Sequence, residues 1–118
     1  MKRIVVTPRA EAALDDILAY TIERWGEAQA DAYVSRLLER VRRLAVGLPP
    51  QATPCAALMR GRRRDVGDLK YCREGAHFLI LRETPDTLQI IEIFHARMDI
   101  ERHLQRLADA AGEDHEQR

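Results

Sequence analysis

An apolar stripe in residues 30–45 constrains the fold of this chain more than any other feature of its sequence. The members of the stripe recur at the i, i+3, i+4 spacing that places side chains on one face of an α-helix, and they are Ala30, Tyr33, Val34, Leu37, Leu38, Val41, Leu44 and Ala45. The arginine and glutamate side chains of the segment fall on the opposite face. Gly47 and two prolines follow and end the helix. A helix that is apolar along one face must pack that face against another element.

A second helix is expected immediately before the first, over residues 8–25. Thr7 suits the N-cap, and Pro8 suits the first helical position, where its missing N–H costs nothing. Its apolar stripe consists of Ala10, Ala13, Leu14, Ile17, Thr21 and Trp25. Because Gly26 alone separates the two segments, they are predicted to form an antiparallel helical hairpin that covers a sheet.

Segments rich in β-branched and apolar residues are predicted to form that sheet, at residues 3–7, 69–73, 77–83 and 88–95. Turns are expected at Glu74–Gly75 and Pro85–Asp86, between the last three strands. The final strand is mostly apolar on both faces, which is typical of a central strand covered on both sides. The hairpin can cover one face, and the other needs the last helix or a partner. From the two apolar faces of residues 88–95 we predict that a partner covers the second face.

The last helix is expected to begin after Asp99, a good N-cap residue, and to stop at Gly112. The element order is then β-α-α-β-β-β-α. We predict an α+β fold, an antiparallel sheet of about four strands with a helical hairpin packed on one face. Residues 1–111 form a single domain, and residues 112–118 are expected to be a disordered tail.

The composition excludes several classes of function. Hydrophobic residues make up 46% and charged residues 32% of the 118-residue chain, which is typical of a soluble globular domain. It contains neither an apolar run of about 20 residues nor a signal peptide, so no membrane association is expected. A formal net charge of +0 argues against a general nucleic-acid binder. Cys55 and Cys72 lack the spacing of a metal site, so neither metal nor cofactor is expected, and the cytoplasm is the expected compartment.

Positive charge is nevertheless concentrated in one irregular stretch. Residues 48–68 show neither helical nor strand periodicity, and they contain Arg60, Arg62, Arg63 and Arg64. A long loop in a small domain is often functional, and arginine is suited to bidentate contacts with carboxylates. We treat this arginine cluster as a candidate contact for a target or an acidic partner, with a solvated loop as an equally weighted alternative.

The last strand runs directly into His95, Arg97 and Asp99. A ribonuclease needs a base, a proton donor and cations facing a charged transition state, and His77, Arg82, His95 and Arg97 are residues of these types. The sequence fixes no second acid or base beside His95 and Arg97. We favour an architectural role, in which His95 hydrogen-bonds the backbone, Asp99 caps the helix and Arg97 pairs with a carboxylate. A direct contact with a target or partner stays open for His95 and Arg97.

Three stretches, in this order and spacing, resemble the ParE toxins of the RelE/ParE superfamily. The first runs from Ala13-Leu14-Asp15-Asp16-Ile17 to Trp25-Gly26, and the second contains Gln29-Ala30, Tyr33 and Leu37-Leu38. The third and most distinctive is the strand at residues 90–94 followed by His95-Ala-Arg97-Met98-Asp99 and Arg102-His103-Leu104. The likeness extends over roughly residues 4–108, nearly the whole domain.

This resemblance implies a cytoplasmic bacterial protein, the toxin component of a type II toxin–antitoxin system. It implies two partners: a ParD-like antitoxin whose C-terminal segment wraps and neutralises the toxin, and DNA gyrase, which the free toxin inhibits without catalysis. Sequence-specific binding to nucleic acid is not expected. Two alternatives remain, a ribosome-dependent mRNA endoribonuclease of RelE type and a non-toxic relative that only binds its antitoxin.

Antitoxin contacts are predicted among aromatic side chains and on the last strand, at Tyr20, Trp25, Tyr33, Ile90, Glu92 and Phe94. For Trp25 we favour packing in the core over an interface role, because it lies on the apolar stripe of its helix. Glu92 lies within an apolar strand, where unpaired burial is costly. We therefore expect Glu92 to form an ion pair with Arg82 on the neighbouring strand.

Overall fold

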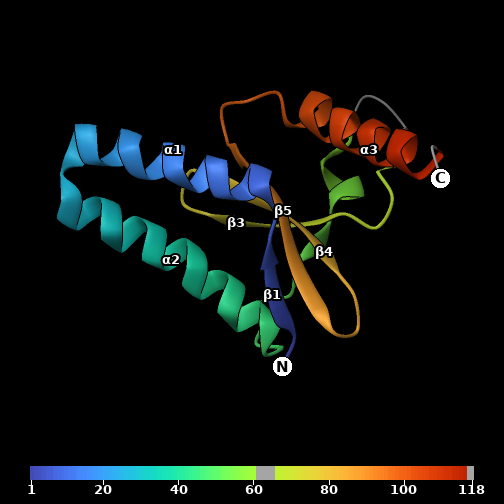
Figure 1. Ribbon diagram of the computed structural model, residues 1–118, viewed down its shortest axis with the longest axis horizontal. Helices are drawn as coiled ribbons and strands as arrows, with labels where there is room; N and C mark the ends of the chain where they lie inside the picture. The colour runs from blue at the N-terminus through green and yellow to red at the C-terminus, as the bar shows by residue number, and fades with distance from the viewer. Residues whose placement is uncertain (61–65, 117–118) are drawn as a thin grey trace.

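The computed structural model describes residues 1–60 and 66–116 as a mixed sheet with helices on both faces (Figure 1). The elements in chain order are β1 (Arg3–Val6), α1 (Pro8–Trp25), α2 (Glu27–Ala45), β2 (Thr53–Pro54), the 3-10 helix η1 (Cys55–Leu58), β3 (Lys70–Glu74), β4 (His77–Glu83), β5 (Thr87–His95) and α3 (Ile100–Glu116). The predicted α+β class and the predicted helical hairpin are confirmed. None of the described helices combines the length and apolarity needed to cross a membrane.

The sheet has five strands in the order β1-β5-β4-β3-β2, and it is mixed where we expected an antiparallel sheet of about four. β1 pairs with β5 in parallel, with Ile4 opposite Leu88, whereas the other neighbours are antiparallel. The short β2 comes from the stretch that lacked periodicity. Thr7 joins strand to helix, because its N–H donates to the Ile90 carbonyl at 3.1 Å and its hydroxyl accepts from the Ala10 N–H at 3.2 Å.

The helical hairpin covers one face of the sheet (Figure 1). Both predicted stripes supply the core on this face, with Ala10 and Ile17 from α1 and Leu37 and Val41 from α2. The two helices meet at Gly26, whose φ of 89° lies in the region that side chains with a Cβ rarely adopt. The hairpin therefore turns in a single residue, and its closed end reaches beyond the sheet (Figure 1).

The opposite face is covered by α3 and by the segment that contains η1. Its core joins Leu104 and Leu107 of α3 to Ile80 and Phe94 of the sheet and Cys55 of η1. The prediction that a partner covers this face is wrong, because α3 and η1 already bury its apolar side chains. The helix continues to Glu116, past the stop expected at Gly112.

A β-bulge changes the two faces of β5. Ile80 lies opposite Glu92 but the next residue, Leu81, lies opposite Ile90, so Ile91 is an extra residue on β5. Strict alternation predicted that Ile90 and Phe94 share a face. The bulge instead places Leu88, Ile90 and Ile93 in the core under the hairpin and leaves Ile91 and Phe94 in the core under α3.

Candidate functional site

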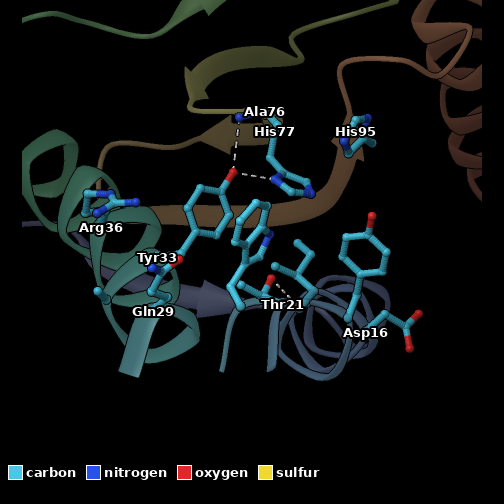
Figure 2. A pocket seen from close by; sticks show the side chains of 12 residues that line it. Asp16, Thr21, Gln29, Tyr33, Arg36, Ala76, His77 and His95 are labelled. Carbon is cyan, nitrogen blue, oxygen red and sulfur yellow. Dashed lines mark hydrogen bonds between the residues drawn. The ribbon is translucent and has the colours of Figure 1, made fainter. Parts of the chain in front are cut away.

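A groove of about 620 Å³ opens between the projecting end of the hairpin and the end of the sheet (Figure 2). Helices α1 and α2 supply most of its lining, the turn between β3 and β4 supplies a further part, and the end of β5 completes it. The lining residues are Asp16, Ile17, Tyr20, Thr21, Trp25, Gln29, Ala32, Tyr33, Arg36, Ala76, His77 and His95. Four residues singled out in the sequence, Tyr20, Trp25, Tyr33 and His95, are brought together here.

Two exposed aromatic side chains line this groove. Trp25 is 61% exposed and Tyr20 is 60% exposed. The expectation that Trp25 packs in the core is wrong, because the last turn of α1 lies on the part of the hairpin that extends past the sheet (Figure 1). Large rings left in water at the edge of a groove are typical of surfaces that bind another protein.

Tyr33 of α2 ties the hairpin to the turn between β3 and β4. Its hydroxyl accepts a hydrogen bond from the Ala76 N–H at 3.1 Å and is 2.5 Å from Nδ1 of His77 (Figure 2). Burial is the main cause that raises the pKa of Tyr33 above its usual value, so the phenol is neutral and keeps its proton for donation. This side chain therefore fixes the distance between the hairpin and the sheet at one end of the groove.

Gly75 allows this close approach. It has a φ of 57°, and a Cβ built at Gly75 would lie 2.8 Å from a ring carbon of Tyr33. Both the backbone conformation and the contact therefore favour glycine at this position.

We expect Gly75→Ala to lower the free energy of unfolding by about 2 kcal/mol, because it combines left-handed strain with a clash against Tyr33. Chemical denaturation measures this change. Gly47→Ala is the matched control: its φ is 80° with nothing within 4 Å of a built Cβ, so it carries the backbone strain alone, about 1 kcal/mol. Equal losses in the two variants would show that the Tyr33 contact does not constrain the turn.

His77 is held neutral in the wall of the groove. Burial, and to a smaller extent the neighbouring His95, lower the pKa of His77 from 6.5 to about 4. The two imidazole rings meet edge to face, with their centroids 5.2 Å apart. His95 in turn accepts a hydrogen bond at Nδ1 from the Arg97 N–H at 3.0 Å.

The low pKa of His77 predicts a loss of stability in acid. The unfolded chain binds a proton on this residue near its ordinary pKa of 6.5, whereas the folded chain resists protonation until about pH 4. The contribution of neutral His77 is therefore complete above pH 6.5 and is lost as the pH falls toward 4. We expect about 1–2 kcal/mol, after a discount for the solvent that reaches the half-buried ring.

Denaturation curves between pH 7 and pH 4 measure this effect against His77→Asn, which keeps an acceptor for Tyr33 but does not titrate. The variant should lose less stability over this range than the natural chain. Parallel stability curves for the two proteins would contradict the assignment.

The remaining antitoxin candidates do not line the groove. Ile90 and Phe94 are buried in the two cores, so their side chains have no surface to present to a partner. Glu92 is half-buried and accepts from the Ile93 N–H at 3.1 Å. The expected ion pair between Glu92 and Arg82 is wrong, because Glu92 lies opposite Ile80 and Arg82 instead pairs with Asp68 at 3.0 Å.

The corner after β5 is mainly architectural. The bond from the Arg97 N–H to His95 and the bond from the Arg102 N–H to the Asp99 carboxylate, at 3.3 Å, are the two roles expected there. Arg97 is exposed, and no carboxylate of the described residues lies within ion-pair distance of it. In the arginine cluster, the backbone N–H of Arg60 donates to Glu101 at 2.8 Å, whereas residues 62–64 lie outside the described part of the chain.

Arg36 and Gln29 line the groove but were not predicted as site residues from the sequence, and His77 was considered there only as a possible nuclease group. The sequence carried no sufficient signal for His77, because the register set by the Pro85–Asp86 turn places it opposite Phe94, and only the bulge in β5 brings it opposite His95.

Metal and thiol chemistry find little support in the described residues. Among residues 1–60 and 66–116, no group of three or more potential metal-ligating side chains is found. Burial raises the pKa of Cys72 to about 11 and that of Cys55 to about 12, so both thiols stay protonated at neutral pH.

A helical hairpin on a mixed sheet, with a groove at the hairpin's projecting end, defines a fold class that is found among solved toxin–antitoxin structures. A chain from the chromosomal ParDE TA system of P. aeruginosa has this fold, with a TM-score of 0.60 over 82% of the present chain and 98% of its own. The two sequences are 21% identical, so this likeness speaks for the fold.

Comparison of sequences identifies the family more specifically than comparison of folds. The family model for the ParE toxin of type II toxin–antitoxin system, parDE, matches residues 4–100. Toxin ParE1 of Mycobacterium tuberculosis is 31% identical over 86% of this chain and 97% of its own, and toxin ParE1 of Caulobacter vibrioides is 33% identical over 88% and 99%. Toxin ParE of Escherichia coli is 30% identical over 92% and 96%. The chain belongs to the ParE toxin family of type II toxin–antitoxin systems.

Proposed function

We propose that this chain is neutralised by a ParD-like antitoxin and, when free, inhibits DNA gyrase in the bacterial cytoplasm. The match to the ParE toxin family over residues 4–100 is the observation that carries the proposal. The family description names a parDE pair, which supports an antitoxin of ParD type. Gyrase as the target follows from the resemblance to the family.

The antitoxin would dock in the groove. Trp25 and Tyr20 offer exposed aromatic surface on one wall, and Tyr33 holds the opposite wall in place. Aromatic anchors in a preformed groove are the features that dominate the energy of protein–protein interfaces. Ile90 and Phe94 contribute indirectly, since they pack the sheet beneath. Glu92 is not among the groove residues.

Catalysis fits the groove poorly. A ribonuclease must gather cations around the phosphate that it cleaves, together with an acid and a base. Arg36 is the only Lys or Arg in the lining of the groove as the structure describes it, and Figure 2 shows it on the far side of Tyr33 from His95. This arrangement supports a toxin that acts by binding and does not turn over a substrate.

Contact with gyrase is assigned to the exposed corner after β5. Arg97 is solvent-exposed and lies next to His95, outside the groove lining that the antitoxin would fill. The arginine cluster at residues 60–64 is a second proposed contact. An antitoxin in the groove and gyrase on the corner would lie close enough to exclude each other, which accounts for neutralisation.

A supercoiling and DNA-cleavage assay with purified bacterial gyrase tests the proposal. The chain alone should stop supercoiling and accumulate cleaved DNA, and a ParD-like antitoxin that binds it should reverse both effects. Arg97→Ala should weaken inhibition without altering antitoxin binding. Translation arrest with cleaved transcripts would instead select the ribonuclease alternative. Antitoxin binding without any effect on gyrase or growth would select the non-toxic relative.

A further inference from the structure

The hydrogen atoms on two groove histidines can be placed from their partners, and His77 is the clearer case. The Tyr33 oxygen already accepts from the Ala76 N–H at 3.1 Å, so its own hydrogen must be donated elsewhere. Nδ1 of His77 is 2.5 Å away and the Glu74 carbonyl is 3.3 Å away, so the histidine is the better acceptor. A neutral imidazole that accepts at Nδ1 carries its hydrogen on Nε2.

The same reasoning applies to His95. The Arg97 N–H can only donate, and it points at Nδ1 of His95 at 3.0 Å. Nδ1 is therefore an acceptor, and the hydrogen of a neutral His95 ring lies on Nε2. Both rings thus carry an N–H donor at the nitrogen that their local hydrogen bonds leave unused.

These two donors lack acceptors in the described part of the chain. The hydrogen bonds of both rings are made at Nδ1, and both residues line the groove. Figure 2 shows the second nitrogen of His77 pointing away from Tyr33, with His95 beyond it. Among the described residues Asp16 is the one carboxylate in the lining, and Figure 2 shows it directed away from the two rings. The donors are therefore free to bind an incoming group.

Building on the antitoxin role proposed above, we propose that His77 and His95 form a two-donor site for a carboxylate of the antitoxin segment that fills the groove. A carboxylate offers two acceptor oxygens, which matches two N–H donors on rings whose centroids are 5.2 Å apart. Hydrogen bonds to a carboxylate are stronger than hydrogen bonds to a neutral carbonyl. Arg36, in the same lining, adds positive charge at the groove.

The occupant is thus an antitoxin segment with a large apolar side chain beside Trp25 and Tyr20 and an aspartate or glutamate that reaches His77 and His95. Replacing that acidic residue of the antitoxin by its amide should therefore weaken binding, because both hydrogen bonds lose the charge of their acceptor. A carbonyl acceptor of the antitoxin backbone would fill the same donors, and no acidic side chain of the antitoxin would then contribute. The two cases therefore differ in a measurable way.

Asparagine and glutamine variants distinguish the role of the Nδ1 acceptor from the role of the Nε2 donor. His77→Asn keeps an acceptor where Nδ1 lies and removes the Nε2 donor, and His95→Asn does the same for its ring. We expect each asparagine variant to bind the ParD-like antitoxin about tenfold more weakly, through the loss of one charge-assisted hydrogen bond. His77→Gln, with its amide nearer the Nε2 position, should bind more tightly than His77→Asn.

Calorimetric titration of the full chain measures the affinity for a ParD-like antitoxin, in its natural form and with its acidic residues replaced one at a time by their amides. His103→Asn is the matched control, because His103 lies on α3 against Phe94 and not in the groove. Nitrogen NMR of the natural chain tests the site without any substitution. The Nε2–H signals of His77 and His95 should shift when the antitoxin binds.

If both asparagine variants bind the antitoxin with the affinity of the natural chain, and the Nε2–H signals do not shift, the two-donor site is wrong. The proposed antitoxin role would stay intact. Weakened binding by the asparagine variants, with no loss of affinity when any acidic residue of the antitoxin is replaced by its amide, would replace the carboxylate by a neutral acceptor and so overturn this assignment of the occupant. A natural chain that does not bind the antitoxin at all would overturn the proposed function itself, and the two-donor site with it.

Discussion

Trp25→Ala is expected to weaken binding of the ParD-like antitoxin about 100-fold while changing the free energy of unfolding by less than about 0.5 kcal/mol. The two effects separate because the indole is 61% exposed in the free chain and lines the groove. Its truncation therefore leaves no cavity in either core. In a complex the same ring would be covered by the antitoxin, so its loss would remove a large buried contact.

Titration calorimetry and urea denaturation measure the two quantities on the same preparation. Val46→Ala is the matched control, because Val46 is also exposed, at 50%, but lies at the other end of the hairpin outside the groove. Its affinity for the antitoxin should equal that of the natural chain. Unchanged affinity in Trp25→Ala would move the antitoxin away from this groove.

Regular periodicity is what made most of the fold predictable. The stripe of α2 recurs over four turns, and Leu37, Val41 and Leu44 are buried as the spacing requires. Thr7 and Pro8 begin α1 as their capping chemistry predicts, and Gly26 ends it. Signals of this kind are local, because each depends on residues within one or two turns of one another.

Features that depend on distant residues were predicted poorly. The parallel pairing of β1 with β5 joins residues more than 80 positions apart, with no turn between them to fix the direction. The bulge at Ile91 shifts the register within β5, and the local alternation of apolar residues does not reveal it. The ion pair expected between Glu92 and Arg82 does not form, because Arg82 pairs with Asp68, which lies in the stretch without periodicity.

The groove was also hard to predict, because its residues are placed by packing between distant parts of the chain. Trp25 continues the stripe of Ala10 and Ile17, and only the length of the hairpin relative to the sheet leaves it exposed. Tyr33 also lies on a stripe, yet its hydroxyl is used to hold the β3–β4 turn. Hydrophobic periodicity identifies the inner face of a helix, but it does not show where the covering sheet ends.

Leu104→Ala is expected to destabilise the chain by about 3–4 kcal/mol, a larger loss than Gly75→Ala should cause. Leu104 is 0% exposed, and it lies in the core between α3 and the sheet with Ile80 and Phe94. Its truncation removes buried apolar surface and leaves a cavity that the neighbouring strand cannot fill. Urea denaturation followed by circular dichroism measures the loss.

Arg106→Ala, at an exposed position on the same helix, is the control and should stay within about 0.5 kcal/mol of the natural chain. The comparison also decides which element covers the second face of the sheet. A loss below about 1 kcal/mol for Leu104→Ala would mean that α3 is held only loosely in solution. That face of β5 would then be available to a partner, as the two apolar faces of the strand first suggested. A full loss would make α3 an integral part of the fold and leave the groove at the hairpin end as the surface for the antitoxin.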